Sequence, residues 1–445
     1  MNIKNKKIGI WGFGVVGKSA LAYLRTLTPH LEVFDNNPLP PESITLLDGI
    51  PVAPDLKTFL EQNDFIVPSP GIDLYPHAHY SHKWLSELDL FAHANTGITV
   101  AVTGTSGKTS VTQLLGQLIN AHGIQCAVGG NIGTGMLELL RNKSDMTLLE
   151  LSSFQLELNK SFAPDLAIWT NFSPNHLDRH GKLESYFEAK YKMLAYQNSE
   201  QQALLPWSLR DQLKKYNPSS ALNFFTTHTL TPEQLGAVDT QERVYFIKDG
   251  VIVEYHNQTT TQLMHVDTLP KISFLDNWVL ICAALHLLNI PTTAIAQATA
   301  NLQLPEHRLE HVATIRGIDF YNDSKSTTPT STFAAIAQLQ ARPIHLFLGG
   351  ISKGIDRSDL IKNIKGKVVH VYCFGKEAEI LYDLCLTHGI PSSAYATLET
   401  AVADCIKNMH SGDQLLFSPA GASFDLFKNY EERGKIFKAL VNSYR

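Results

Sequence analysis

A glycine-rich turn with a lysine among hydroxyl residues lies at 103–110, where the sequence reads Thr-Gly-Thr-Ser-Gly-Lys-Thr-Ser. It follows the apolar run 98–102 and opens a helical pattern over 111–119, which is the strand–turn–helix context of a phosphate-binding loop. Backbone N–H groups and the helix dipole attract anions at such a position. Lys108 would place its charge on the outer phosphates, and Thr109 would offer a hydroxyl to Mg²⁺. A turn without a ligand is the alternative. The residues expected to contact the nucleotide are Gly104, Thr105, Ser106, Gly107, Lys108, Thr109 and Ser110.

Two further polar side chains stand at the ends of predicted strands. Glu150 follows the strand 147–149, and His176 comes after the strand 167–170. Mg²⁺ prefers oxygen ligands and keeps several waters, so a carboxylate beside a phosphate loop is typical of its site. Each residue also has a structural explanation, since Glu150 could cap a helix and His176 could be an ordinary polar residue. Together with the phosphate loop they favour a metal–nucleotide site.

The first segment, residues 1–95, carries a second glycine-rich turn. The sequence Gly-Phe-Gly-Val-Val-Gly at 12–17 follows the strand 8–11 and precedes a helix expected over 18–27. Asp35 ends the next strand, about 20 residues on, which completes the dinucleotide or nucleotide fingerprint. The strand 65–67 ends at Ser69-Pro70-Gly71, and ligands bind at such strand ends in open α/β sheets.

The second segment, residues 96–300, alternates strands with helices, which predicts a mostly parallel sheet. Its expected strands are 98–102, 147–151 and 166–169, and its expected helices are 108–121, 183–194, 274–288 and 292–302. A hairpin is expected over 244–255 around Asp249-Gly250. A mobile loop region is expected over 219–242.

The third segment, residues 301–445, resembles a second α/β unit. Its expected strands are 318–321, 345–348, 369–374 and 414–417, and its expected helices are 332–339, 377–388, 398–409 and 427–441. Loops of short polar side chains at 322–327, 349–356 and 418–425 follow three of the strands. One such loop could be a helix cap, whereas three from one domain predict a shared cleft. The expected fold class is therefore α/β with three domains: a Rossmann-like N-terminal domain, a central P-loop ATPase-type parallel-sheet domain and a Rossmann-like C-terminal domain.

Length and composition restrict the function further. A chain of 445 residues corresponds to roughly three domains. A net charge of −5 gives no strong basic field, so no nucleic-acid partner is expected. No apolar run approaches the length of a membrane span. The five scattered cysteines fit a reducing compartment, and a cytoplasmic protein is expected.

Three motifs, taken with the phosphate loop, closely resemble the Mur ligases, the ATP-dependent amide-forming enzymes of peptidoglycan precursor synthesis. They are LELSSFQL at 149–156, NDSKST at 322–327 and SPAGASFDLFKNYEERG at 418–434, and the resemblance covers essentially the whole chain. The fingerprint at 12–17 favours the branch that adds D-glutamate to UDP-N-acetylmuramoyl-L-alanine. The resemblance implies that ATP converts the substrate carboxylate to an acyl phosphate. The amine of D-glutamate then attacks, giving amide, ADP and phosphate.

The resemblance also implies roles for individual residues. Lys108, His176, Lys190 and Lys325 are implied as catalytic, with Lys190 carbamylated, although the pattern alone would make Lys190 a surface lysine on an amphipathic helix. Two Mg²⁺ sites are implied, formed by Thr109, Glu150, His176 and the Lys190 carbamate. Besides the phosphate loop, ATP is implied to contact Asn277, Arg308 and Asp323. The implied contacts of the other two substrates are Gly14, Val15, Val16, Asp35, Ser69, Pro70, Gly71, Thr327, Lys353, Ser423 and Tyr430. Asn131 is implied to lie along the path of the nucleotide sugar or of ATP.

The chain departs from the family pattern in a few places. Asn36-Asn37 replace a frequent Thr-Arg pair, and Asp276 and Leu280 stand where the family has His and Asn. The uracil and adenine contacts are therefore left open. Separately, Val102 stands where the general P-loop spacing has its first glycine.

Other functions compete with this one. A sister ligase that adds another amino acid is the nearest, and a folylpolyglutamate-type ligase would lack the first glycine-rich domain. An NAD-dependent oxidoreductase would explain 12–17 but not the second phosphate loop, Glu150 and His176. A nucleotide-sugar binding protein with a dead ATP site would not need Lys108, Thr109 and Lys190. A monomer is expected.

Overall fold

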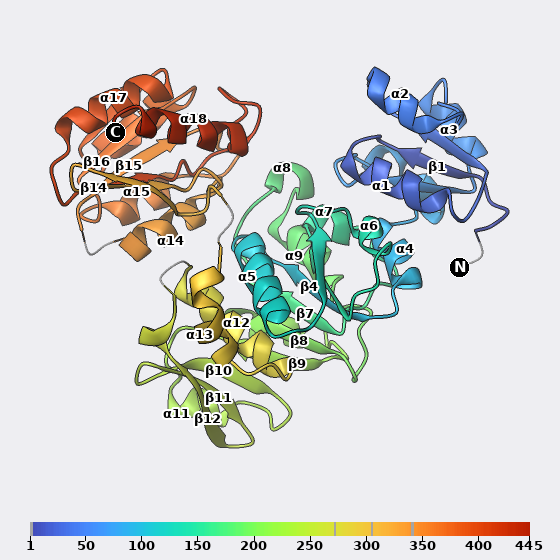
Figure 1. The fold of residues 1–445 in the computed structure, drawn as a ribbon, viewed down its shortest axis with the longest axis horizontal. Helices are drawn as coiled ribbons and strands as arrows, with labels where there is room; N and C mark the ends of the chain where they lie inside the picture. Colours follow the sequence, from blue (N-terminus) through green and yellow to red (C-terminus); the bar gives the residue numbers. More distant parts are fainter. Residues whose placement is uncertain (1–2, 271–272, 304–305, 340–341) are drawn as a thin grey trace. The chain divides into compact units, whose positions relative to one another are not determined.

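The structure, a computed structural model, describes residues 3–270, 273–303, 306–339 and 342–445 (Figure 1). Its contacts divide the chain into two compact units. The first comprises Met1–Asn171, Phe187–Pro270 and Leu275–Leu302, and the second comprises Phe172–Tyr186, Lys271–Phe274 and Gln303–Arg445. Three β-sheets draw their strands from residues 8–68, 98–265 and 310–417. The α/β fold class is confirmed, while domain boundaries at 95 and 300 stay a prediction.

A three-stranded parallel sheet of order β2-β1-β3 begins the first unit. Its strands are β1 (Ile8–Trp11), β2 (Leu31–Phe34) and β3 (Phe65–Pro68). The helical elements around it are α1 (Val15–Leu24), α2 (Pro41–Leu47), α3 (Leu56–Gln62), η1 (Tyr75–Lys83) and α4 (Glu87–Ala94). The helix α1 begins three residues before the predicted start at Lys18, since the glycine-rich turn itself forms the N-terminus of the helix.

A nine-stranded sheet of order β12-β11-β10-β9-β8-β7-β4-β6-β5 completes the first unit. Its strands are β4 (Ile98–Thr103), β5 (Cys126–Gly130), β6 (Met146–Glu150), β7 (Leu166–Trp169), β8 (Gln202–Pro206), β9 (Ala221–Phe225), β10 (Arg243–Lys248), β11 (Val251–His256) and β12 (Thr259–His265). Pairing is parallel except at β10–β11–β12, so the predicted hairpin is confirmed and β12 extends it.

The loop region predicted over 219–242 is wrong. It contains β9, which pairs with β8 and β10, and the short helix α11 (Pro232–Gly236). Phe224 and Phe225 are buried at the end of β9. The polar and Thr-rich residues around this five-residue strand obscured it, because only its last three residues are buried.

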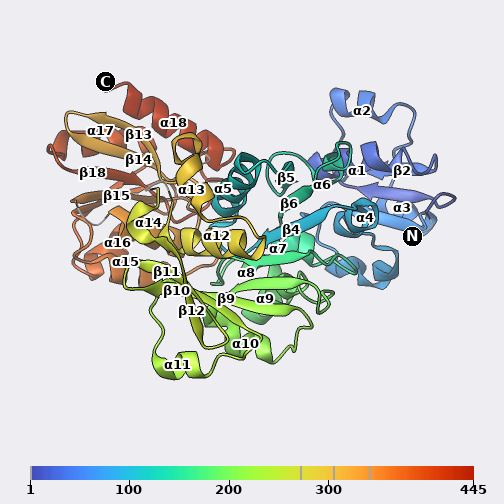
Figure 2. The ribbon, with the colours of Figure 1, turned by 60° about the horizontal axis from the view of Figure 1, so that its bottom comes forward.

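Helices of this part include α5 (Lys108–Ala121), α6 (Met136–Leu139), α7 (Ser153–Leu156), α10 (Arg210–Lys214), α12 (Leu275–Leu287) and α13 (Thr293–Ala298), with η2 (Trp207–Leu209), η3 (Val266–Thr268) and η4 (Thr299–Asn301). The helix α9 (Leu183–Tyr191) passes from the second unit into the first. The helix α5, predicted at these bounds, contacts α12 and α13 (Figures 1 and 2). Buried residues run without a break from 277 to 285 in α12, which is typical of a helix surrounded by protein.

The second unit contains a six-stranded sheet of order β13-β14-β18-β15-β16-β17, parallel except for β13. Its strands are β13 (Glu310–Ile315), β14 (Ile318–Asn322), β15 (Ile344–Gly349), β16 (His370–Phe374), β17 (Ser392–Tyr395) and β18 (Gln414–Phe417). One face packs on α14 (Pro329–Leu339), α15 (Ser358–Ile364) and α16 (Ala378–Thr387), and the other on α17 (Leu398–Asn408) and α18 (Tyr430–Asn442). The helix α8 (Leu177–His180) also belongs to this unit.

Two sequence expectations concern thiols and membranes. The five cysteines are free and buried. In the part of the chain that the structure describes, no helix has the length and apolar character needed to span a bilayer.

Glu87 is a buried carboxyl group in the first unit. It begins α4, which contacts α6, and its Oε1 has no hydrogen-bond partner among the described residues. Burial, and secondarily the charge of Glu138, raises the pKa of Glu87 from 4.5 to about 8. The native state therefore keeps a proton that the unfolded chain releases at lower pH.

Glu87→Gln is expected to change how stability depends on pH. Because the folded-state pKa is raised, the wild-type free energy of unfolding should fall as pH rises from about 4.5 to about 8. The neutral amide removes this slope, so the variant should be the more stable protein above pH 8. Urea denaturation between about pH 4.5 and about pH 8 measures the free energy of unfolding of both proteins. Parallel pH profiles for the two proteins would contradict the prediction.

Candidate active site

The phosphate loop joins β4 to α5 through two glycines in left-handed conformations. Gly104 has φ 146° and Gly107 has φ 79°, values that favour glycine. A Cβ on Gly104 would collide with the hydroxyl of Thr170, so the loop lies directly against the end of β7. Thr109 and Ser110 are buried in the first turn of α5. The predicted strand–loop–helix geometry is confirmed.

Lys108 folds back over the loop. Its Nζ donates to the carbonyl oxygens of Gly104 at 2.9 Å and Thr105 at 3.2 Å. The ammonium group is thus held close to the turn whose N–H groups would bind an anion. A compact charge in this position stabilises phosphate oxygens as a point charge.

Glu150 ends β6, directly beside β4 in the sheet, and is only 2% exposed. Its Oε1 accepts a hydrogen bond from Asn131 Nδ2 at 3.0 Å, whereas Oε2 has no partner among the described residues. A buried carboxylate oxygen without a partner is costly. A divalent cation would remove that cost, so the carboxylate fits a Mg²⁺ ligand. Among the described residues, no group of three His, Cys, Asp or Glu is arranged to hold a metal ion.

Lys190 lies under the same loop and is 1% exposed. Its Nζ donates to the Gly104 carbonyl at 2.8 Å and lies 3.4 Å from the Thr103 hydroxyl. Burial first, and then the charge of Lys108, lowers the pKa of Lys190 well below its ordinary value, with Glu150 opposing. A surface lysine, the alternative from the pattern alone, is therefore excluded. A neutral amine at this position is the form that can react with carbon dioxide.

His176 lies in the segment 172–186 of the second unit. It stands in a left-handed conformation, with φ 53°, directly before α8. Its assignment as a metal ligand stays a prediction. Asn277 lies on α12, where its Oδ1 would be 2.9 Å from a Cβ on Gly107, so it borders the phosphate loop.

The predicted substrate residues of the first sheet meet at its carboxyl edge. Asp35 Oδ2 accepts the Phe13 N–H at 2.7 Å, and Ser69 Oγ donates to the Gly12 carbonyl at 3.0 Å. These bonds attach the ends of β2 and β3 to the glycine-rich turn after β1. Val15 is 71% exposed at the start of α1. Gly14 lies in the turn after β1, Val16 lies in the first turn of α1, and Pro70 and Gly71 lie in the turn after β3.

The three polar loops of the second unit are hydrogen-bonded to one another, while the shared cleft expected from them stays a prediction. The Ala420 N–H donates to the Ser326 carbonyl at 3.1 Å, and Ile351 and Ala422 exchange two backbone hydrogen bonds of 2.8 Å. The loops after β14, β15 and β18 therefore form one surface. Thr327, Lys353 and Ser423 belong to it, and Arg308 lies in the segment that precedes β13.

Asp323 is the buried centre of these loops. It accepts hydrogen bonds from Ser326 Oγ at 2.6 Å, Ser418 Oγ at 2.7 Å and the Leu309 N–H at 3.1 Å. Burial outweighs these bonds and raises the pKa of Asp323 to about 6. The side chain ties the loops to each other, and a contact with adenosine stays a prediction.

Two lysines of these loops lie over aromatic rings. Lys325 Nζ is 3.6 Å from the centre of the Tyr430 ring, and Lys353 Nζ is 5.8 Å from that of Phe424. Cation–π contacts of this kind orient ammonium groups without neutralising them.

Comparison with known proteins identifies the family. The profile of the Mur ligase middle domain matches residues 102–265, and that of the Mur ligase, glutamate ligase domain, matches residues 307–421. The UDP-N-acetylmuramoylalanine--D-glutamate ligase of Thermoanaerobacter sp. (strain X514) is 31% identical over 470 residues, covering 100% of both chains. The enzyme of that name from Acidobacterium capsulatum is 34% identical over 468 residues, covering 100% of this chain and 98% of its own.

The chain belongs to the Mur ligase family. A solved structure of MurF ligase from Thermotoga maritima, in complex with ADP, resembles it in fold with a TM-score of 0.58. The two share 17% sequence identity, and the match covers 87% of this chain and 92% of the other. The family resemblance predicted from the motifs is confirmed.

Arg433 is a structural residue of this Mur ligase whose burial was not predicted, although it lies within the motif at 418–434. Its side chain is 0% exposed and its guanidinium donates to Ser324 Oγ at 3.0 Å, the Ser324 carbonyl at 2.6 Å and the Gly421 carbonyl at 2.9 Å. It therefore binds the loop after β14 to the loop after β18. Between two glutamates and a glycine at the start of α18, it looks like a surface arginine, and no local pattern could have revealed its burial.

Arg433→Lys is expected to lower the free energy of unfolding by about 2–4 kcal/mol, because a lysine cannot reproduce the planar set of donors in a buried site. Denaturation of the full chain measures the loss. Arg445→Lys is the control, since Arg445 makes one exposed hydrogen bond, to the Val312 carbonyl, and should change stability by less than about 0.5 kcal/mol. Equal losses in the two variants would contradict the bridging role.

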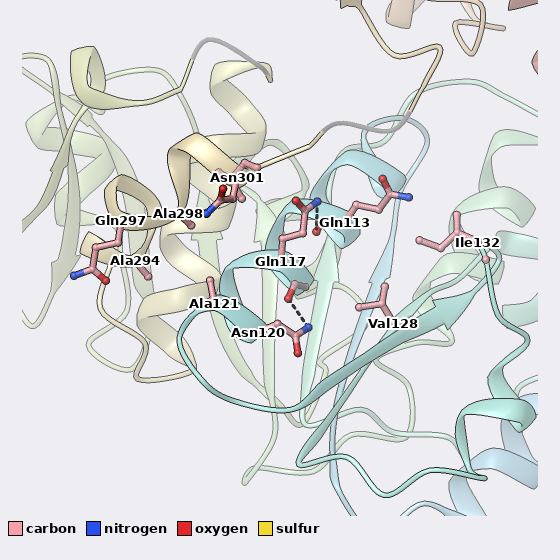
Figure 3. Close-up of a pocket in the computed structure, with 13 residues that line it drawn as sticks. Gln113, Gln117, Asn120, Ala121, Val128, Ile132, Ala294, Gln297, Ala298 and Asn301 are labelled. Carbon is pink, nitrogen blue, oxygen red and sulfur yellow. Dashed lines mark hydrogen bonds between the residues drawn. The ribbon is translucent and has the colours of Figure 1, made fainter. Parts of the chain in front are cut away.

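A cavity of about 760 Å³ lies apart from the phosphate loop in the first unit (Figure 3). It is lined by α5, by β5 with the residues after it, and by α13 with η4; Gln113, Gln117 and Asn301 are among its polar residues. None of its lining residues is charged and none belongs to the loop 104–110. A triphosphate would find no counter-charge there, so this cavity is not the nucleotide site.

Proposed function

We propose that this Mur ligase joins D-glutamate to UDP-N-acetylmuramoyl-L-alanine, with ATP forming an acyl phosphate and ADP and phosphate leaving. The observation that carries the proposal is the phosphate loop with the buried pair Glu150 and Lys190 beneath it. The names of full-length relatives more than 30% identical supply the substrates. A carboxylate oxygen is a poor leaving group, so phosphorylation is what makes amide formation possible.

The residues of the loop would position ATP. Its N–H groups and Lys108 would hold the phosphates and neutralise charge as the γ-phosphoryl group transfers, which is the main source of rate in such reactions. A bound Mg²⁺ would supply further positive charge to neutralise the phosphates. Thr109 and Glu150 would hold a first Mg²⁺.

Lys190 would act as a carbamate. Its neutral nitrogen attacks the carbon of carbon dioxide, one proton leaves to solvent, and the product is a carboxylate on the lysine. The low pKa of Lys190 favours the neutral amine that this reaction needs. The new carboxylate and His176 would hold a second Mg²⁺.

The other substrates would be divided between the remaining parts of the chain. Residues 1–95 would bind the uridine diphosphate at the carboxyl edge of the first sheet, with Asn131 along the same path. Residues 96–300 would bind ATP, with Asn277, Arg308 and Asp323 towards adenosine. Residues 301–445 would bring D-glutamate, whose two carboxylates would meet Lys325, Thr327, Lys353, Ser423 and Tyr430. We propose a cytoplasmic monomer.

A coupled phosphate-release assay tests the proposal. With ATP, Mg²⁺ and UDP-N-acetylmuramoyl-L-alanine, phosphate should appear when D-glutamate is added and not with L-glutamate or a diamino acid. If phosphate is released only with a different amino acid, the chain is instead a sister ligase that adds that amino acid. A change in absorbance at 340 nm with NAD and no phosphate release would favour an oxidoreductase instead.

A further inference from the structure

Asn171, a residue outside the phosphate-binding motif, forms hydrogen bonds to Ser106 in the middle of the phosphate loop. Asn171 Oδ1 accepts hydrogen bonds from the Ser106 N–H at 2.9 Å and the Ser106 hydroxyl at 3.2 Å, and its Nδ2 donates to the Ser106 carbonyl at 3.1 Å. The Asn171 carbonyl also accepts the Thr105 N–H at 3.1 Å. One carboxamide therefore pairs with both backbone groups of a single loop residue, in the way that a neighbouring strand would.

The same residue borders the second glycine of the loop. A Cβ on Gly107 would lie 4.0 Å from Asn171 Nδ2. The Thr170 hydroxyl reinforces the attachment by donating to the Ser106 carbonyl at 2.6 Å. The unusual backbone conformations of the loop are thus held in place from the end of β7.

The hydrogen bonds of Asn171 to the loop also affect the two lysines of the site. Both Lys108 and Lys190 donate to the Gly104 carbonyl, at 2.9 Å and 2.8 Å. The direction of that carbonyl depends on the conformation of the turn that Asn171 holds. Loss of the hydrogen bonds at Ser106 would therefore misplace both the N–H groups of the loop and the ammonium groups of Lys108 and Lys190.

We propose that Asn171 is a positioning residue for the nucleotide, whose carboxamide presets the phosphate loop and so strengthens nucleotide binding without touching the nucleotide. The inference rests on the proposed use of ATP. A purely structural role would lower stability and leave the affinity for nucleotide unchanged. Preorganisation instead increases affinity, because the loop need not be ordered when the ligand binds.

The variant Asn171→Ala removes the carboxamide, and Asn223→Ala is its matched control. Asn223 is a buried residue of β9 in the same sheet, and its Nδ2 donates to the carbonyls of Ala203 and Ala221, both at 3.3 Å. Calorimetry of the full chain with ADP and Mg²⁺ measures affinity, and melting temperature measures stability. Asn171→Ala should bind ADP about tenfold more weakly. Asn223→Ala should lose stability only.

Two further measurements keep the inference open to refutation. Asn171→Asp keeps the acceptor oxygen, loses the Nδ2 donor and adds a negative charge near the phosphates, so it should bind ADP more weakly than Asn171→Ala. The affinity of Asn171→Ala for UDP-N-acetylmuramoyl-L-alanine should stay within about twofold of wild type. Wild-type affinity for ADP in Asn171→Ala, or equal loss of both affinities, would overturn the inference. Failure of the wild-type protein to bind ADP would instead refute the proposed function.

Discussion

Lys108→Ala is expected to reduce phosphate release by at least about a thousandfold, because the charge that neutralises the transferring phosphoryl group is lost. Binding of UDP-N-acetylmuramoyl-L-alanine should be nearly unchanged. The contacts proposed for that substrate belong mainly to the turns after β1, β2 and β3, whereas Lys108 contacts Gly104 and Thr105. Steady-state kinetics give the first quantity and calorimetry with the UDP substrate gives the second.

An exposed lysine of the same unit is the control for this prediction. Lys214 on α10 is exposed, so Lys214→Ala should keep wild-type activity. Loss of UDP-substrate binding in Lys108→Ala, with the fold intact, would show that the proposed division of substrates between the parts of the chain is wrong.

Lys190→Ala is expected to lose at least about a hundredfold in activity, since the carboxylate proposed for the second Mg²⁺ disappears. Alanine leaves space under the loop where a short carboxylic acid could supply the missing group. Acetate or propionate should therefore restore part of the activity in a concentration-dependent way. The measurement is phosphate release across a series of acid concentrations.

The same acids applied to Lys108→Ala provide the matched control. No recovery is expected there, because a carboxylate cannot replace an ammonium group. Absence of recovery in Lys190→Ala at every concentration would count against the carbamate, and equal recovery in both variants would point to a general effect of the acid.

The positions and roles of residues within one turn or at the end of one strand were the most predictable from sequence. The helix 108–121 and the strands 166–169 and 414–417 occur at their predicted bounds. Local spacing was sufficient because glycines, apolar runs and helix starts are short-range signals. Glu150 and Lys108 were found in this way.

Residues whose roles depend on distant packing were less predictable. Lys190 has the pattern of a surface lysine, yet it is buried because α9 brings it beneath a loop some 86 positions earlier in the chain. Arg433 reaches carbonyls and a hydroxyl of loops up to 109 positions away. Asn171 has no predicted role, because its bond to Ser106 depends on the pairing of β7 with β4. No helical or strand periodicity encodes such contacts.

Titration calorimetry of the intact chain with ATP, with and without Mg²⁺, addresses the central claim most directly. We expect binding in the range of about 1 µM to 1 mM that strengthens with Mg²⁺, and Glu150→Gln should lose most of that strengthening. Failure of the folded wild-type chain to bind ATP under either condition would contradict the assignment of the loop after β4 as the triphosphate site, and with it the proposed reaction.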